Sequence, residues 1–166
     1  MSRLRQTALA CTLAAGLLIG WEGKSNKAYL DVVQVPTICY GETKHVRMGD
    51  VKTDTECTQL LWKEIHRIDA VISRTVRVDI PDHTRAAFIS FIYNVGDGAF
   101  LASDAYRRLN RSDIQGACDA LTRRDYSTGR CRGYGCGWAD GKMIKGLQNR
   151  RADERLMCLG KHNDKN

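Results

Sequence analysis

The stretch from Trp21 to Thr43 constrains the fold more than any other part of this chain of 166 residues. Apolar positions alternate along it, and Gly23, Asn26, Pro36 and Gly41 interrupt the alternation. Gly, Asn and Pro break helices and favour turns, whereas alternating apolar residues are typical of strands. The stretch is therefore predicted to form a loop and a small irregular sheet rather than a long helix.

Three side chains of this stretch carry acid or hydroxyl groups that suit the hydrolysis of a sugar polymer. Glu22 directly follows a run of apolar residues, Asp31 comes nine positions later, and Thr37 comes six positions after Asp31. A glycosidase needs two carboxyl groups, one to protonate the leaving oxygen and one to activate water or attack the sugar. Most Glu and Asp pairs at such a spacing only face solvent, so the spacing alone does not establish a site.

The whole string from Glu22 to Thr43 is more specific than the spacing. It reads E-G, then A-Y-x-D, then P-T-I-x-Y-G-x-T, and it resembles the active-site signature of the phage-type lysozymes, glycoside hydrolase family 24. The resemblance implies a catalytic triad of Glu22, Asp31 and Thr37. It continues downstream, because residues 88–100 are similar to the second family signature and residues 146–154 to the third.

The resemblance also implies a fold. We expect an α+β protein that is mostly helical, in which a small irregular β lobe holds the active site. A long helix joins this lobe to a helical C-terminal lobe. In this sequence the small lobe would span residues 21–53, the linking helix 54–74 and the helical lobe 75–166, so that the catalytic domain covers 21–166.

The implied activity is that of a phage endolysin that lyses the host cell by hydrolysing the β-1,4 bond between N-acetylmuramic acid and N-acetylglucosamine in peptidoglycan. Glu22 would be the general acid, with a pKa raised by partial burial against Trp21 or Ile19. Asp31 would be the base or charge stabiliser, and the Thr37 hydroxyl would hold the attacking water. The family is inverting, which implies carboxyl groups about 6.5–9.5 Å apart.

Two pairs of residues in the downstream signatures have two interpretations each. Tyr93 and Asn94 either line the sugar groove or pack against and cap their own helix. Arg150 and Arg151 either pair with carboxylates, with Glu22 as one candidate, or form a solvated basic face. For Arg151 the solvated face is the favoured interpretation.

Two other function classes compete with hydrolysis. A lytic transglycosylase would need Glu22 but no partner that positions water, so the presence of Asp31 and Thr37 favours hydrolysis. A basic binding module would explain the net charge of +7 and the pI near 9.2 but not the triad spacing. No nucleic-acid motif accompanies the charge. We expect a monomer whose substrate is peptidoglycan. We expect it to bind no nucleic acid, no metal and no organic cofactor.

Residues 1–20 begin with Arg3 and Arg5 and continue with a run rich in Ala, Leu, Thr and Gly. This pattern is typical of a signal sequence, although the run is short for a bilayer span of about 20 residues. No A-x-A site sits between this run and Glu22, and the segment resembles the signal-anchor-release segments of some endolysins. An exported enzyme would then act in the host periplasm, first tethered to the inner membrane. The alternative is a buried first helix that packs on the core.

Seven cysteines are many for a reducing compartment, and none forms a convincing zinc pattern. We therefore expect disulfides, with one cysteine left over. A local bridge is expected in the glycine-rich loop 125–141, and the family resemblance implies the pairing of Cys118 with Cys158. A bridge between Cys39 and Cys57 would tie the small sheet to the long helix. The expected pairs are Cys39–Cys57, Cys118–Cys158 and Cys131–Cys136. Cys11 is the expected free thiol, which either exchanges with the Cys39 bridge after membrane release or is a small apolar packing residue.

Helix signals are clear after the small lobe. Thr53 and Glu56 have the spacing of a capping box ahead of a helix at 54–74, and Pro81 suits the start of an apolar helix at 82–95 that should end at Gly96. Ser103 and Ser112 are candidate N-caps of the next two helices. The expected helices in this part of the chain are 54–74, 82–95, 103–110, 112–123 and 142–159.

Overall fold

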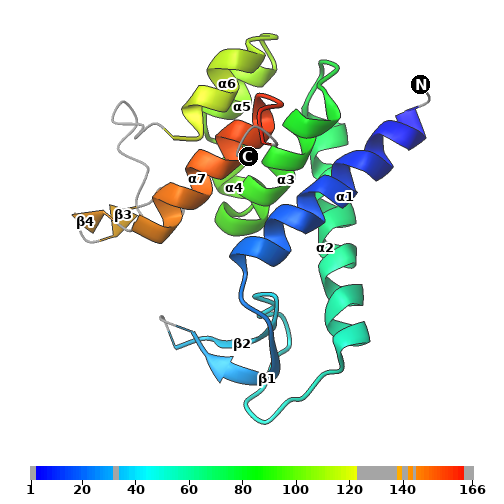
Figure 1. The fold of residues 1–166 in the computed structure, drawn as a ribbon, viewed down its shortest axis with the longest axis vertical. Helices are drawn as coiled ribbons and strands as arrows, with labels where there is room; N and C mark the ends of the chain where they lie inside the picture. Colours follow the sequence, from blue (N-terminus) through cyan, green and yellow to red (C-terminus); the bar gives the residue numbers. More distant parts are fainter. Residues whose placement is uncertain (1–2, 32–33, 123–137, 140–141, 144, 163–166) are drawn as a thin grey trace.

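Two lobes make up the fold. The computed structural model describes residues 3–31, 34–122, 138–139, 142–143 and 145–162. Two short strands, β1 (Ser25–Leu30) and β2 (Pro36–Cys39), form the small lobe, and the long helix α2 (Asp54–Thr75) runs from it to a group of helices (Figure 1). The predicted α+β class, with a small β lobe joined by a long helix to a helical lobe, is confirmed.

The other elements belong to the helical part. The short helix α4 and the small hairpin of β3 and β4 are not among the predicted elements. In chain order the remaining elements are α1 (Arg3–Trp21), α3 (Asp82–Val95), α4 (Asp97–Leu101), α5 (Asp104–Leu109), α6 (Ile114–Ala120), β3 (Trp138–Ala139), β4 (Lys142–Met143) and α7 (Lys145–Cys158).

Helix α2 begins at the predicted capping box. The backbone N–H of Glu56 donates to the Thr53 hydroxyl at 3.2 Å, and the backbone N–H of Thr53 donates to the Glu56 carboxylate at 2.7 Å. These two bonds satisfy donors that the first turn of a helix otherwise leaves without partners. The apolar stripe of α2, which includes Leu61, Ile65 and Ile68, is buried in the core.

Helix α3 is the centre of the helical lobe, as its apolar sequence predicts. It packs against α1, α2 and α7 (Figure 1). Its side chain Phe88 is completely buried and lies 5.8 Å, ring centre to ring centre, from Phe100 of α4. The helix ends where predicted, at Gly96, whose φ of +83° is a conformation that favours glycine.

Helix α1 packs on α3 and α2, so in this structure it has the position of a buried first helix. Cys11, Ala14 and Leu18 on its inner face are completely buried. The helix runs past residue 20 without a break and ends at Trp21. Among the described residues, no helix combines the length and the apolarity that crossing a bilayer requires.

The predicted starts of α6 and α7 are wrong, whereas the predicted start of α5 is correct. Ser103 does cap α5, since its hydroxyl accepts from the backbone N–H of Tyr106 at 3.0 Å. For α6, however, the N-cap is Asp113 rather than Ser112, because the Asp113 carboxylate accepts from the Gly116 N–H at 2.9 Å. Ser112 instead has a φ of +61° in the turn before the helix.

The start of the last helix also differs from the prediction. Residues 142 and 143 form strand β4, which pairs antiparallel with β3, and α7 begins only at Lys145. The backbone at 142–143 thus has its partners in a hairpin rather than in a helical turn. Most of the loop predicted at 125–141, including the expected Cys131–Cys136 bridge, lies outside the described residues.

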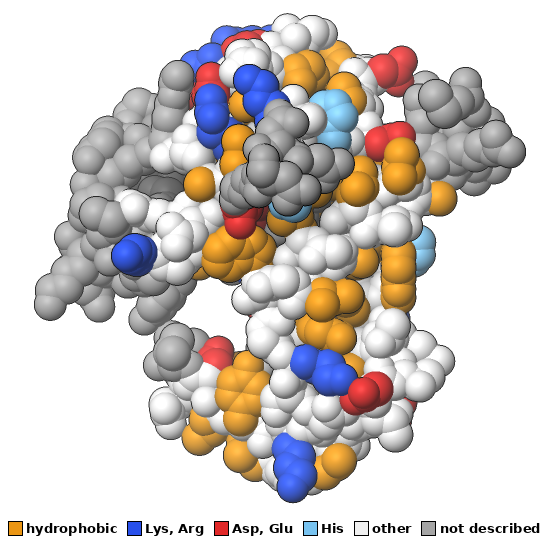
Figure 2. Space-filling model, viewed as in Figure 1, with side chains coloured by type: hydrophobic (Ala, Val, Ile, Leu, Met, Phe, Trp, Pro, Cys, Tyr) orange, Lys and Arg blue, Asp and Glu red, His pale blue; other side chains and the backbone are white. Residues whose placement is uncertain are grey.

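The small sheet is irregular, as the Gly, Asn and Pro content predicts. Its register pairs Tyr29 with Thr37 and Ser25 with Cys39, and it shifts between these two pairs. Hydrophobic side chains reach the surface of this lobe (Figure 2). Those with large exposed fractions are Tyr29, Leu30, Val35, Met48 and Val51.

Candidate active site

The turn between β1 and β2 places Asp31 and Thr37 close together. The backbone N–H of Asp31 donates to the Val35 carbonyl at 3.0 Å, and the Val35 N–H donates to the Asp31 carboxylate at 2.8 Å. The Thr37 hydroxyl donates to the same Val35 carbonyl at 3.0 Å. Both predicted site residues are therefore attached to Val35, because the hairpin register brings the two strand ends together.

Glu22 lies at the opposite boundary of the small lobe, where α1 ends. Its backbone N–H donates to the Leu18 carbonyl at 2.7 Å, which continues the helical pattern by one residue. A Cβ atom built on Gly41 would lie only 3.6 Å from Oε2 of Glu22. The backbone just after β2 therefore runs beside the Glu22 carboxylate, so Glu22 is at the junction of the two lobes.

The partner of Glu22 in the helical lobe is Arg150 of α7. Arg150 Nη1 donates to Oε1 of Glu22 at 2.5 Å, with the Glu22 side chain 21% exposed and the Arg150 side chain only 5% exposed. The sequence predicts that apolar side chains, Trp21 or Ile19, surround the Glu22 carboxyl group. The structure does not support the Ile19 part, because Ile19 is 53% exposed, and it adds a guanidinium in contact with the carboxylate. Packing of Glu22 against Trp21 stays a prediction.

A second carboxylate holds Arg150 from the other side. Arg150 Nε donates to Oε1 of Glu154 at 3.1 Å, and Arg150 Nη2 donates to the Ser90 carbonyl at 3.2 Å. The Ser90 hydroxyl donates to the same Oε1 of Glu154 at 2.7 Å. All three guanidinium nitrogens of Arg150 are therefore engaged, and the direction in which Arg150 meets Glu22 is fixed by α3 and α7.

Arg151 is also buried, which overturns the favoured interpretation of a solvated basic face. Its Nη2 donates to the Asn94 side-chain oxygen at 2.6 Å, and its guanidinium carbon lies 4.8 Å from the centre of the Phe91 ring. Its Nη1 lies 2.7 Å from Oε2 of Glu154 without an aligned N–H, so this contact is an ion pair only. Burial lowers the pKa of Arg151 to about 10, and the nearby Arg150 adds to the fall.

Tyr93 and Asn94 both have structural partners. The Tyr93 hydroxyl donates to the Tyr40 carbonyl at 2.7 Å, which connects α3 to the small lobe. Burial raises the pKa of Tyr93, and the charge of Glu22 adds to the rise. Asn94 accepts from Arg151 as described above. A role of either residue in sugar binding stays a prediction.

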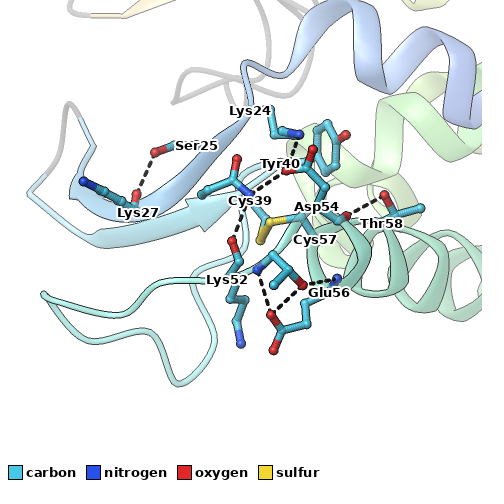
Figure 3. Close-up of a disulfide and its surroundings, with 12 residues drawn as sticks. Lys24, Ser25, Lys27, Cys39, Tyr40, Lys52, Asp54, Glu56, Cys57 and Thr58 are labelled. Carbon is cyan, nitrogen blue, oxygen red and sulfur yellow. Dashed lines mark hydrogen bonds and ion pairs between the residues drawn. A yellow bond between two sulfur atoms is a disulfide. The ribbon is translucent and has the colours of Figure 1, made fainter.

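Two expected disulfides are present. Cys39–Cys57 joins the end of β2 to α2, beside the ion pair of Lys24 with Asp54 (Figure 3). Cys118–Cys158 joins α6 to α7. The predicted free thiol, Cys11, is free and buried on α1, with its sulfur 3.9 Å from Nδ1 of His66.

The Cys11 thiol has an environment that suppresses reactivity. Burial raises its pKa to about 11, and the negative charge of Asp69 adds to the rise. Since the thiolate is the attacking species in thiol–disulfide exchange, this conformation favours the interpretation of Cys11 as a packing residue.

The described part of the chain contains no group of three or more acidic, His or Cys side chains that could hold a metal ion.

Comparison with known proteins matches most of this sequence to a family. The family model "Phage lysozyme" matches residues 19–154, which include Glu22, the hairpin and the Arg150–Glu154 segment. The chain belongs to the phage lysozyme family. Its activity is that of a lysozyme, a glycoside hydrolase that breaks down host peptidoglycan and so lyses the host cell.

The most informative relatives of this phage lysozyme are endolysins. A SAR-endolysin of bacteriophage PS119 is 44% identical over 141 residues, covering 84% of this chain and 77% of the relative. A SAR-endolysin of Pseudomonas phage phiKMV is 34% identical over 158 residues, covering 94% and 91%. A mutant of P22 lysozyme superposes with a TM-score of 0.70 at 30% identity, covering 88% of this chain and 94% of that structure.

Sequence reasoning missed one residue of the site. Glu154 lies in the third family signature, but its contact with Arg150 was not predicted from the sequence. The spacing of the two residues does put both on one face of a helix. The missing signal was burial. The helix α7 is rich in charged residues, and nothing in its composition indicates that this face lies against α3.

Proposed function

We propose that Glu22 is the general acid of this phage lysozyme, that Asp31 is the base or charge stabiliser, and that Thr37 holds the attacking water. The bond hydrolysed is the β-1,4 link between N-acetylmuramic acid and N-acetylglucosamine. The observation that supports this assignment best is the position of Glu22, between Arg150 of the helical lobe and the backbone at Gly41 of the small lobe.

The contact with Arg150 divides the roles of the two Glu22 oxygens. Oε1 meets the guanidinium, while Oε2 faces the small lobe at Gly41. Oε2 is then the oxygen that carries the proton to the leaving sugar. Once the proton has gone, Arg150 stabilises the carboxylate that remains, since an opposite charge at contact distance favours the ionised form.

Asp31 and Thr37 act on the water that attacks the sugar. The Thr37 proton is directed at the Val35 carbonyl, so its oxygen lone pairs are oriented to accept from a water molecule. Asp31 is held by Val35 in the adjacent turn and takes a proton from the same water as it attacks. We expect Asp31→Asn and Thr37→Ala to lower kcat with little change in KM, because both interactions form in the transition state.

We also propose that α1 begins in the inner membrane and enters the core after release. The supporting observations are the name SAR-endolysin carried by the relatives and the absence of any charged residue from Thr7 to Gly20. Both faces of that segment can therefore leave water, although only one face is buried in the fold. The enzyme would then be tethered first and act in the periplasm.

Analysis of the products tests the reaction type. Purified peptidoglycan is digested, and the fragments are analysed by mass spectrometry. A reducing muramic acid end is expected, because water attacks the anomeric carbon. A 1,6-anhydro end would show transglycosylation, in which the sugar's own hydroxyl replaces water, and would contradict the roles of Asp31 and Thr37.

A further inference from the structure

The structure assigns a positioning role to Glu154: this buried carboxylate fixes the direction in which Arg150 meets Glu22 and balances the charge of the second guanidinium, Arg151. The inference rests on the proposed role of Glu22 as the general acid. Glu154 touches neither sugar nor water, so its effect on the reaction passes through Arg150.

The first support is the geometry of the contacts. Glu154 is completely buried, and its Oε1 accepts from both Ser90 and Arg150. Arg150 has its Nε on Glu154 and its Nη1 on Glu22, so one planar group connects the two carboxylates. Rotation of Arg150 away from Glu22 would break its bonds to Glu154 and to the Ser90 carbonyl at the same time.

The second support is the charge balance. Two carboxylates, Glu22 and Glu154, lie among two guanidinium groups, Arg150 and Arg151. Without the Glu154 charge, two cations would act on Glu22 and favour its ionised form, which cannot donate a proton.

Three further titratable groups belong to other parts of the chain: Tyr93 on α3, Glu42 after β2 and Glu64 on α2. Tyr93 of α3 is close enough to Glu22 for the Glu22 charge to raise the Tyr93 pKa, and two further carboxylates act on Tyr93 in the same way. Burial raises the pKa of Glu154 itself, and the two arginines oppose this rise. The charged and titratable groups in and around this network include Arg150, Arg151 and Glu154 on α7, Tyr93 on α3, Glu42 after β2, and Glu64 on α2.

The test is the pH dependence of kcat/KM for cell-wall cleavage by the full chain, whose alkaline limb reports the pKa of the essential acid in the free enzyme. Glu154→Gln keeps the side-chain oxygen for Ser90 and Arg150 but removes the charge. We expect its alkaline limb to move down by about one pH unit, the size of shift that a nearby charge produces. On the alkaline side this is about a tenfold loss of activity.

Three companion variants separate charge from structure. Arg151→Gln removes a cation and should move the limb up, and the double variant Glu154→Gln with Arg151→Gln should bring it back near the parent position. Ser90→Ala removes a hydrogen bond but no charge, so its limb should coincide with that of the parent. The Tm of each variant is recorded, because loss of a buried charge destabilises. If Glu154→Gln does not fold, the upward shift in Arg151→Gln decides.

Specific outcomes would overturn the inference. The limb of Glu154→Gln could coincide with that of the parent while only the Tm falls, which would make Glu154 a structural residue. A shift of equal size in Ser90→Ala would also exclude charge balance as the cause. Glu22→Gln is measured alongside: if that variant keeps normal turnover, the proposed function fails, whereas an inactive Glu22→Gln with unmoved limbs in the other variants rejects only the role of Glu154.

Discussion

The small lobe and the helical lobe achieve their structure by different means. Of the described residues between 22 and 53, only residues 37–40 are buried, and several large hydrophobic side chains of this lobe are exposed (Figure 2). In the helical lobe, α1 and α7 both bury side chains against α3, and the charged residues Arg150, Arg151 and Glu154 are buried with them.

The difference shows how the site is shared. The small lobe supplies Asp31 and Thr37 on a short hairpin that is attached by a disulfide, by the Lys24–Asp54 ion pair and by the Tyr93–Tyr40 hydrogen bond. The helical lobe supplies a rigid, charge-balanced support for Glu22. The groups that act on water thus lie on the lightly attached lobe, and the group that donates the proton is fixed by the core.

The largest expected effect is on activity, at the residue where the lobes meet. Glu22→Gln removes the proposed proton donor and should lower cleavage by at least the 10²–10⁴-fold that is typical of general acid catalysis. The fold should survive, because Gln keeps an oxygen for Arg150. Turbidity loss of cell walls and a thermal melt measure the two properties. Normal turnover in a folded variant would reject the assignment.

The next effect contrasts a buried side chain of the helical lobe with an exposed side chain of the small lobe. Phe88→Ala in the helical lobe should lower the free energy of unfolding by about 3–5 kcal/mol, the cost typical of truncating a buried aromatic residue. Val51→Ala on the exposed surface of the small lobe should change it by less than about 0.5 kcal/mol. Urea unfolding of both variants measures the difference. Equal losses would mean that the small lobe depends on its apolar surface more than its exposure indicates.

The two disulfides should separate stability from activity. Their loops have sequence separations of 18 and 40, for which the chain-entropy model gives about 3 and about 4 kcal/mol. Cys39→Ser with Cys57→Ser should lower activity as well as stability, since β2 carries Thr37. Cys118→Ser with Cys158→Ser should lower stability only. Chemical unfolding and lysis assays on both double variants check this, and full activity without the Cys39–Cys57 bridge would contradict it.

The smallest expected effect concerns an ion pair that connects α2 to α4. Arg67 donates two hydrogen bonds to Asp97 and lowers the pKa of Asp97 below its ordinary value of 3.8. The pair therefore stabilises the fold above pH 3.8, and the contribution is lost as the pH falls through the lowered pKa. Asp97→Asn should cost about 0.5 kcal/mol at pH 7 because the pair is partly exposed.

The Asp97→Asn experiment needs unfolding curves at two values of pH. The difference from the parent should be present at pH 7 and should shrink at the acid end of the range. A difference that is the same at both values would show that the lost stability comes from packing of the side chain rather than from its charge.

The sequence predicted those features that depend on neighbouring residues. The capping box at Thr53 and Glu56 and the end of α3 at Gly96 are local signals, and the structure contains both. The family, the fold class and the Cys118–Cys158 pair followed from motif resemblance. Where a competing polar group stood one position away, as Asp113 does beside Ser112, the sequence alone could not choose the cap.

Only the tertiary structure decided the surroundings of the proposed acid. Glu22 and Arg150 are separated by 128 positions, and no local pattern connects them. The sequence left open whether the charged face of α7 is solvated or paired with carboxylates. In the structure α3 covers this face, and the carboxylates among the guanidiniums offset the cost of burying them. Propensity and periodicity report the preference of a segment for helix or strand, whereas the charge that a buried carboxyl group experiences depends on which distant segment the fold places beside it.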